Sequence, residues 1–238
     1  MSDAVIPLRQ YSALRRLKFR LLQHLPGQRG LHYRRRMMEV NAPQTLAAFR
    51  AAQARTKGKI AVDLGANRGV FSREIAATAS HVHAFEPDPW TAAILREELK
   101  DLGNVTVHEA AAGAAAGTLP IYRHRDYADN PLGLSQSSTL RQDVSDVDSS
   151  VAVAEVAVID FPAFLKSLDA PVGILKIDIE GGELDLLPAL FASDVLERVD
   201  YIFCETHETI LPEAQDQFAK LRQQARRSRH PVINMDWL

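Results

Sequence analysis

The sequence predicts an α/β fold built on a mostly parallel, doubly wound sheet. From Lys59 onward, short apolar runs alternate with longer amphipathic stretches, as in chains whose parallel strands are joined by helices. The 238 residues, 46% hydrophobic and 24% charged, have the composition of an ordinary globular protein. We therefore expect an N-terminal extension over residues 1–58 and one α/β domain over residues 59–238.

The N-terminal extension is predicted to be helical and basic. Leucines recur at helical spacing over Ala13–Leu25, arginines and a lysine lie between them, and a second helix is expected from Pro43 to about Arg55. Residues 1–58 hold twelve Lys and Arg against two acidic residues, a balance of +10, which leaves −12 for residues 59–238. This asymmetry favours either an anionic partner for the extension or attraction between the two parts of the chain.

Five apolar runs are predicted as the strands of the domain, with helices between and after them. The strands are expected at Ile60–Leu64, His81–Glu86, Val105–Glu109, Ile174–Ile179 and Tyr201–Glu205. The helices are expected at Val70–Thr78, Trp90–Leu102, Phe161–Leu168, Glu183–Phe191 and Pro212–Arg226. Two smaller strands, Gly117–Tyr122 and Val153–Ile159, bracket a polar insertion over residues 123–150 that we expect to be a mobile loop or lid.

The turn after the first predicted strand is a candidate ligand-binding loop. It reads Asp63-Leu64-Gly65-Ala66-Asn67-Arg68-Gly69, and glycines there allow the backbone to approach a ligand beside the N–H groups that begin the next helix. Ala66-Asn67 stands where a dinucleotide-binding loop needs its second glycine, so the loop does not indicate NAD or FAD. A plain strand-to-helix turn is the alternative.

Glu86 ends the second predicted strand, twenty-one residues after Gly65. An acidic residue at this separation lies at the carboxyl end of the neighbouring strand, where it can accept hydrogen bonds from a ribose diol. A helix cap or an ordinary surface acid is the alternative for Glu86 taken alone. The pairing with the glycine loop favours the binding role.

Charged residues also gather at the ends of the fourth and fifth strands. Lys176, Asp178 and Glu180 alternate with apolar residues, so a strand would place all three on one side. Lys176 is expected either to act in the site or simply to neutralise Asp178. Glu205 and His207, two residues apart, end the next strand. Open α/β sheets bind their ligands at this edge.

Together these segments resemble S-adenosylmethionine-dependent methyltransferases, and more narrowly the FkbM family. The resemblance covers about Lys59 to His207. Its segments are Val62–Asn67, Phe85-Glu86-Pro87, Ala111-Ala112-Gly113, Ser137-Ser138, Lys176–Glu183 and Glu205-Thr206-His207. It implies a Rossmann-like methyltransferase fold and transfer of a methyl group to a hydroxyl oxygen, often on a sugar or natural product. The full sheet of that fold has seven strands, and residues 231–238 have room for one after the fifth, so we expect a truncated final strand hairpin.

This resemblance and the residue patterns assign the site. We expect the cofactor to contact Asp63, Gly65, Asn67, Gly69, Glu86, Ala111 and Asp178. Methyl transfer to a hydroxyl needs a group that removes the proton, and His207 is the candidate, with Asp178 and Glu180 as alternatives or as orienting groups. Asp178, Glu180, Glu205 and His207 carry the ligand types of a hard cation, but their spacing does not demand one, and we expect no metal.

The predicted function is therefore S-adenosylmethionine-dependent O-methylation of a small-molecule or glycan acceptor. An RNA methyltransferase that uses the basic extension is one alternative, although aromatic residues are sparse there and no nucleic acid is expected. A non-catalytic cofactor-binding protein is another. The Leu- and Arg-rich helix could contact an anionic membrane, and a homo-oligomer could cover the sheet edge. The lone Cys204 and the lack of an 18-residue apolar run predict a cytoplasmic protein.

Overall fold

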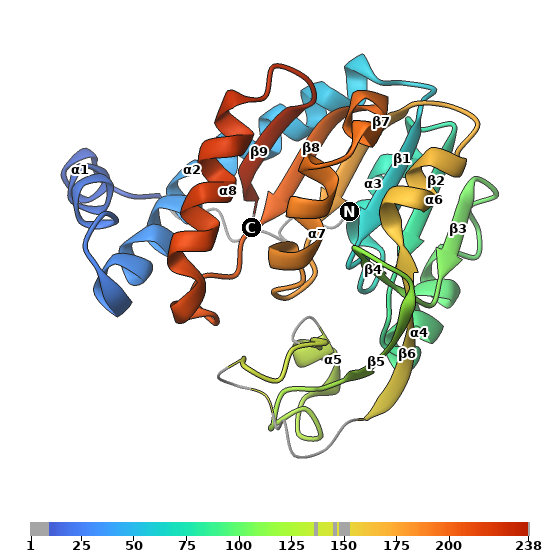
Figure 1. Ribbon diagram of the computed structural model, residues 1–238, viewed down its shortest axis with the longest axis horizontal. Helices are drawn as coiled ribbons and strands as arrows, with labels where there is room; N and C mark the ends of the chain where they lie inside the picture. The colour runs from blue at the N-terminus through green and yellow to red at the C-terminus, as the bar shows by residue number, and fades with distance from the viewer. Residues whose placement is uncertain (1–9, 136–137, 145–146, 148–152, 238) are drawn as a thin grey trace.

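A six-stranded parallel sheet forms the centre of the computed structural model, which describes residues 10–135, 138–144, 147 and 153–237 (Figure 1). The strand order is β3-β2-β1-β7-β8-β9, and every neighbouring pair is parallel. The bounds are β1 Ile60–Leu64, β2 His81–Phe85, β3 Val105–His108, β7 Val172–Ile177, β8 Val199–Glu205 and β9 Val232–Trp237. The predicted doubly wound α/β fold is confirmed.

Helices cover both faces of this sheet. One apolar layer joins the sheet to α6 (Phe161–Ser167), α7 (Glu183–Phe191) and α8 (Gln215–Arg227). Another joins its opposite face to α2 (Gly27–Arg55) and α3 (Val70–Ala76), and a smaller cluster on that face includes α4 (Pro89–Leu99). The arrangement follows from period-two alternation, since neighbouring residues of a strand point to opposite faces. In Figure 1, α6, α7 and α8 lie in front of the sheet and α3 behind it.

A second, three-stranded sheet carries the polar insertion. Its order is β4 (Ala111–Gly113), β6 (Ala154–Asp160) and β5 (Gly117–Ile121). The insertion between β5 and β6 includes the short helix α5 (Pro131–Leu134). Sequence alone predicted a polar lid here, yet the buried Tyr122, Val144 and Val147 pack into the main core. Two isolated valines have no periodicity to read, which is why this anchoring was not predicted. The mobility of the insertion stays a prediction.

The long helix α2 departs most from the sequence-based expectation. It begins at Gly27, whereas a helix was expected only from Pro43 onward, and Pro43 lies inside it. Its buried stripe runs through the proline at Leu31, Met38, Ala42, Phe49 and Ala52. Packing of this continuous face outweighs the hydrogen bond that the proline removes. A helix α1 (Ala13–Leu22) precedes it. Among the described residues, no helix is both long and apolar enough to cross a bilayer.

The last strand, β9, forms one edge of the large sheet. It pairs directly with β8 in parallel. Among the described residues, one strand therefore stands where a seven-stranded sheet has a two-stranded hairpin, as the sequence predicted. Asp236 of β9 accepts hydrogen bonds from Arg34 (2.5 Å) and Asn41 (3.1 Å) of α2. The N-terminal extension is thus fixed to the edge of the domain.

Trp237 anchors this contact, and its removal is expected to destabilise the fold. Its ring is fully buried, with centroids 4.7 Å from Phe49 and 4.8 Å from Phe71. We expect Trp237→Ala to lower the free energy of unfolding by about 3–5 kcal/mol because it leaves a cavity between α2, α3 and the sheet. Urea unfolding measures this change. Val232→Ala, at an exposed position of the same strand, should cost only about 0.5 kcal/mol. Equal losses would contradict the anchoring role.

Candidate functional site

A cavity of about 930 Å³ opens at the carboxyl ends of β1, β2, β7 and β8. This is the edge at which open α/β sheets bind their ligands, and the volume lies within the range of small-molecule sites. The insertion and α2 supply additional walls, the latter through Arg35 and Glu39. The following residues were predicted for the site from sequence and line this cavity: Gly65, Asn67, Glu86, Ala111, Asp178, Glu180 and His207.

Gly65 brings the first loop against the end of β7. Its φ is +71°, and a Cβ at this position would lie 1.7 Å from the carbonyl oxygen of Asp178. The backbone N–H of Asp178 in turn donates to the carbonyl of Leu64 at 3.1 Å. Only glycine allows this approach. The loop is therefore shaped by its contact with β7 as well as by its exposure to the cavity.

Glu86 is buried at the wall of the cavity. Its Oε2 accepts a hydrogen bond from the N–H of Asn67 at 2.9 Å, and its Oε1 accepts one from the N–H of Asp88 at 3.0 Å. Burial raises the pKa of Glu86 to about 8, although these hydrogen bonds oppose the shift. Each carboxyl oxygen can accept a second hydrogen bond, so the predicted role as a ribose acceptor is chemically available.

A buried ion pair lies beneath the glycine loop. The ammonium of Lys176, 2% exposed, lies 3.1 Å from Asp63 Oδ1, 3.5 Å from Asp178 Oδ2 and 3.3 Å from the Gly65 carbonyl. Burial alone would lower the pKa of Lys176, but the two carboxylates outweigh burial and raise it, so the ammonium stays charged. The sequence left open whether Lys176 acts in the site or neutralises Asp178. The structure shows that Lys176 pairs with Asp178, and that Asp63 is its nearer partner.

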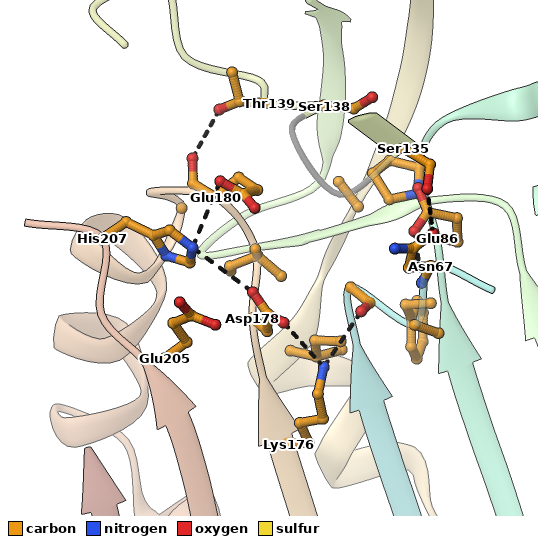
Figure 2. Close-up of a pocket in the computed structure, with 18 of the residues that line it drawn as sticks. Asn67, Glu86, Ser135, Ser138, Thr139, Lys176, Asp178, Glu180, Glu205 and His207 are labelled. Carbon is orange, nitrogen blue, oxygen red and sulfur yellow. Dashed lines mark hydrogen bonds and ion pairs between the residues drawn. The ribbon is translucent and has the colours of Figure 1, made fainter. Parts of the chain in front are cut away.

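His207 lies on the side of the cavity opposite Glu86, close to several carboxyl groups (Figure 2). Its Nδ1 is 3.0 Å from Glu183 Oε1, while its Nε2 is 3.5 Å from Glu180 Oε2 and 3.7 Å from Asp178 Oδ1. Burial would lower the pKa of His207, but Glu183 and Glu180 outweigh it and raise the pKa well above its usual value. These carboxyl groups therefore favour the protonated form of the imidazole.

The segment after β7 presents Glu180 to this histidine. The strand ends at Ile177, two residues before its predicted end at Ile179, so Asp178 and Glu180 both lie in the loop that follows. Its φ is +50°, and its carbonyl accepts a hydrogen bond from Thr139 of the insertion at 2.8 Å. Burial raises the pKa of Glu180 to about 8 despite the opposing charge of His207. This carboxyl group therefore titrates close to neutral pH.

Two residues predicted to contact a cofactor do not line the cavity. Asp63 is fully buried and accepts a hydrogen bond from Ser72 at 2.6 Å in addition to its ion pair with Lys176. Gly69 has φ +79°, and a Cβ there would come within 3 Å of side-chain atoms of Leu95 and Leu99. Both residues therefore contact the protein interior next to the loop and not the cavity.

Several site residues were not predicted from sequence. Glu183, fully buried, accepts hydrogen bonds from the N–H groups of Ile179 and Gly181 at 2.9 Å each and holds His207. Its position three residues after Glu180 was the available signal. Arg35 of α2 reaches Glu205 at 2.8 Å from 170 residues away, a distance in sequence that no local pattern can report.

The atoms of Asp178, Glu180 and His207 that face one another lie within 4.8 Å, and their types could hold a divalent cation. The Nε2 atom of His207 lies 3.7 Å from Asp178 and 3.5 Å from Glu180, so the imidazole itself can pair with both acidic groups. The expectation of no metal stays a prediction.

Comparison with known proteins identifies the family. A model of the methyltransferase FkbM domain matches residues 63–229, more than half of the chain. The chain belongs to the FkbM methyltransferase family. The motifs of the sequence predicted this family. A search of curated proteins gives no match.

Two solved structures show limited similarity to this chain. One is a methyltransferase FkbM from Methylobacillus flagellatus KT, 20% identical over 58% of this chain and 30% of that chain, with a TM-score of 0.36. The other is the 23S rRNA methyltransferase ErmE, 28% identical over 25% of this chain and 26% of that chain, with a TM-score of 0.23. At such TM-scores neither bears on the acceptor.

The raised pKa of Glu86 predicts a pH-dependent contribution to stability. Because the folded pKa of about 8 exceeds the ordinary 4.5, the folded state holds the proton more tightly. Stability from this group is present below pH 4.5 and falls as pH rises toward 8, by up to about 1.4 kcal/mol per pH unit. We expect Glu86→Gln to flatten the decline in unfolding free energy between about pH 5 and about pH 8.

Urea unfolding at several pH values measures these slopes. Glu213→Gln removes an exposed carboxylate and should leave the wild-type slope unchanged. Parallel slopes for Glu86→Gln and wild type would show that Glu86 is not perturbed.

Proposed function

We propose that this methyltransferase transfers the methyl group of S-adenosylmethionine to a hydroxyl oxygen of a sugar, glycan or natural product. One observation carries the proposal, namely the division of a single cavity into two chemically different ends (Figure 2). Asn67 and Glu86 lie at one end, Glu180 and His207 lie at the other, and Asp178 lies between them. A group-transfer enzyme needs such adjoining sites for its donor and acceptor.

The end with Gly65 and Glu86 fits the methyl donor. Gly65 leaves the loop without a side chain, and the carboxyl oxygens of Glu86 can accept hydrogen bonds from ribose hydroxyls. When bound, S-adenosylmethionine supplies a methyl group made electrophilic by a positively charged sulfur. The carboxylate of Asp178 lies between the loop and His207, where negative charge favours a cation.

The other end fits removal of the acceptor's proton. His207 was the leading base from sequence, but its neighbours favour the protonated imidazole, and that form has no lone pair to accept a proton. We therefore assign the proton to a carboxylate oxygen of Glu180, whose pKa of about 8 suits a base near neutral pH. His207 then orients Glu180, and Asp178 is the alternative base.

Polar walls support a hydroxyl-rich acceptor over nucleic acid. Ser138 and Thr139 of the insertion line the cavity. Their hydroxyl groups donate to Asp88 and to the carbonyl of Glu180, and the hydroxyl oxygens can accept hydrogen bonds. Several cations of the basic extension form ion pairs within the chain. Arg34 pairs with Asp236, Arg35 with Glu205 and Arg50 with Glu74. These ion pairs support the interpretation that the basic extension and the acidic domain carry opposite charges because they attract each other.

Cofactor binding gives the first test of the proposed function. S-adenosylmethionine, or its demethylated product, should raise the melting temperature, because a ligand that binds only the folded state stabilises it by about 2.7 kcal/mol at a hundred times its dissociation constant. NAD should not. Glu86→Ala should raise the dissociation constant for S-adenosylmethionine about tenfold or more in calorimetric titration, whereas Glu213→Ala should not change it. Equal shifts with NAD, or no shift with either, would contradict the proposal.

Single-turnover methyl transfer tests the base. With an acceptor found by screening sugars and glycans, we expect Glu180→Gln to slow the reaction by about 10²–10⁴-fold with little effect on cofactor affinity. The wild-type rate should rise with pH through an ionisation near 8, because Glu180 must lose its proton, and Glu180→Gln should abolish that rise.

Asp178→Asn and His207→Ala are the matched comparisons. A near-normal rate for Glu180→Gln, together with loss of the pH dependence in His207→Ala, would return the base to His207. A larger loss in Asp178→Asn would assign it to Asp178.

A further inference from the structure

The first helix, α1, exposes a stripe of leucines. Leu14, Leu17 and Leu21 are 77%, 54% and 65% exposed, and no residue of α1 is buried. At 3.6 residues per turn these three side chains fall within about 60° of the helix circumference. The half-exposed Leu25 follows just after the helix. An apolar stripe on a helix usually faces a core or a partner.

The other side of α1 is fixed to α2, so the stripe is held outward. Phe19 of α1 packs against Tyr11 and Tyr33, with ring centroids 5.2 Å and 6.0 Å apart, and the ammonium of Lys18 lies 5.8 Å from the centre of the Tyr33 ring. Tyr11 also donates a hydrogen bond to Glu39 of α2. In Figure 1, α1 lies at the far end of the molecule, away from the sheet.

Basic residues accompany the leucines. α1 carries Arg15, Arg16, Lys18 and Arg20 and no acidic residue, and residues 10–38 as a whole contain no Asp or Glu. None of these four cations forms an ion pair with the residues that the structure describes, unlike Arg34 and Arg35 of α2. Arg16 donates through its Nε to the carbonyl of Tyr11 at 3.0 Å and Lys18 lies over Tyr33, but neither contact neutralises the charge, so the cations of α1 are available to an external anion.

We propose that α1 docks on the surface of an anionic lipid bilayer. Leu14, Leu17 and Leu21 would enter the boundary between headgroups and acyl chains, and the four cations would contact anionic headgroups. This occupant is favoured over a second copy of the chain by charge. Two α1 helices meeting along the leucines would bring both sets of four cations together with no acid on either helix to pair with them.

Docking would also orient the catalytic cavity. α2 links α1 to the site, because Arg35 of α2 lines the cavity and pairs with Glu205 at 2.8 Å. The bilayer would therefore hold this wall of the cavity at a fixed position relative to the lipid surface. The proposal does not rest on the identity of the methyl acceptor.

Flotation of the full chain with vesicles tests the proposal. We expect binding to vesicles of phosphatidylcholine mixed with phosphatidylglycerol to be at least about tenfold tighter than to phosphatidylcholine alone, and to weaken as salt rises. Leu17→Ser combined with Leu21→Ser should reduce binding about tenfold or more. Leu119→Ser, at an exposed leucine of β5, is the control and should bind as wild type does.

Charge variants separate the electrostatic contribution. Arg15→Gln with Arg20→Gln should weaken binding to the anionic vesicles and leave the residual binding to phosphatidylcholine unchanged. All variants alter exposed side chains, and an unchanged melting temperature verifies their folding. Three results would overturn the proposal: no binding by wild type, unchanged binding by the leucine variant, or a wild-type dimer that the leucine variant dissociates without any vesicle binding.

Discussion

The buried ammonium of Lys176 is the interaction on which the candidate site depends. It is shared by Asp63 of β1, the carbonyl of Gly65 in the following loop and Asp178 after β7. A buried charge is costly unless it is paired and hydrogen-bonded, so these three groups must stay together. Their contact seats the glycine loop against the end of β7 and sets Asp178 between the two ends of the cavity.

Charge balance explains why the N-terminal extension belongs to the site. Carboxylates at the ends of β7 and β8 are met by cations from separate elements, among them Lys176, His207 and, from α2, Arg35. Removing any one cation would leave a buried or half-buried carboxylate without its partner. The basic extension and the acidic domain are thus parts of one electrostatic structure, and the raised pKa of His207 is a consequence of that structure.

Local patterns in the sequence predicted the features that depend on neighbouring residues along the chain. Short apolar runs predicted five of the six strands of the large sheet, and the separation of Gly65 and Glu86 predicted that both lie on one cavity. Long-range contacts were not predictable in this way. The protonation of His207 depends on Glu183 from another element, and α2 continues through Pro43 because its distant partners pack a continuous face. Asp63 occupies its expected position, but its burial beneath the loop depends on Lys176.

The central claim is that one cavity holds the methyl donor and the acceptor at opposite ends. A crystal structure of the chain with S-adenosylhomocysteine tests this claim most directly. We expect the ribose hydroxyls to contact Glu86 and the sulfur to lie near Asp178, facing the end that holds Glu180 and His207. A ligand bound outside this cavity, or bound with its ribose against His207 and its sulfur toward Glu86, would contradict the account.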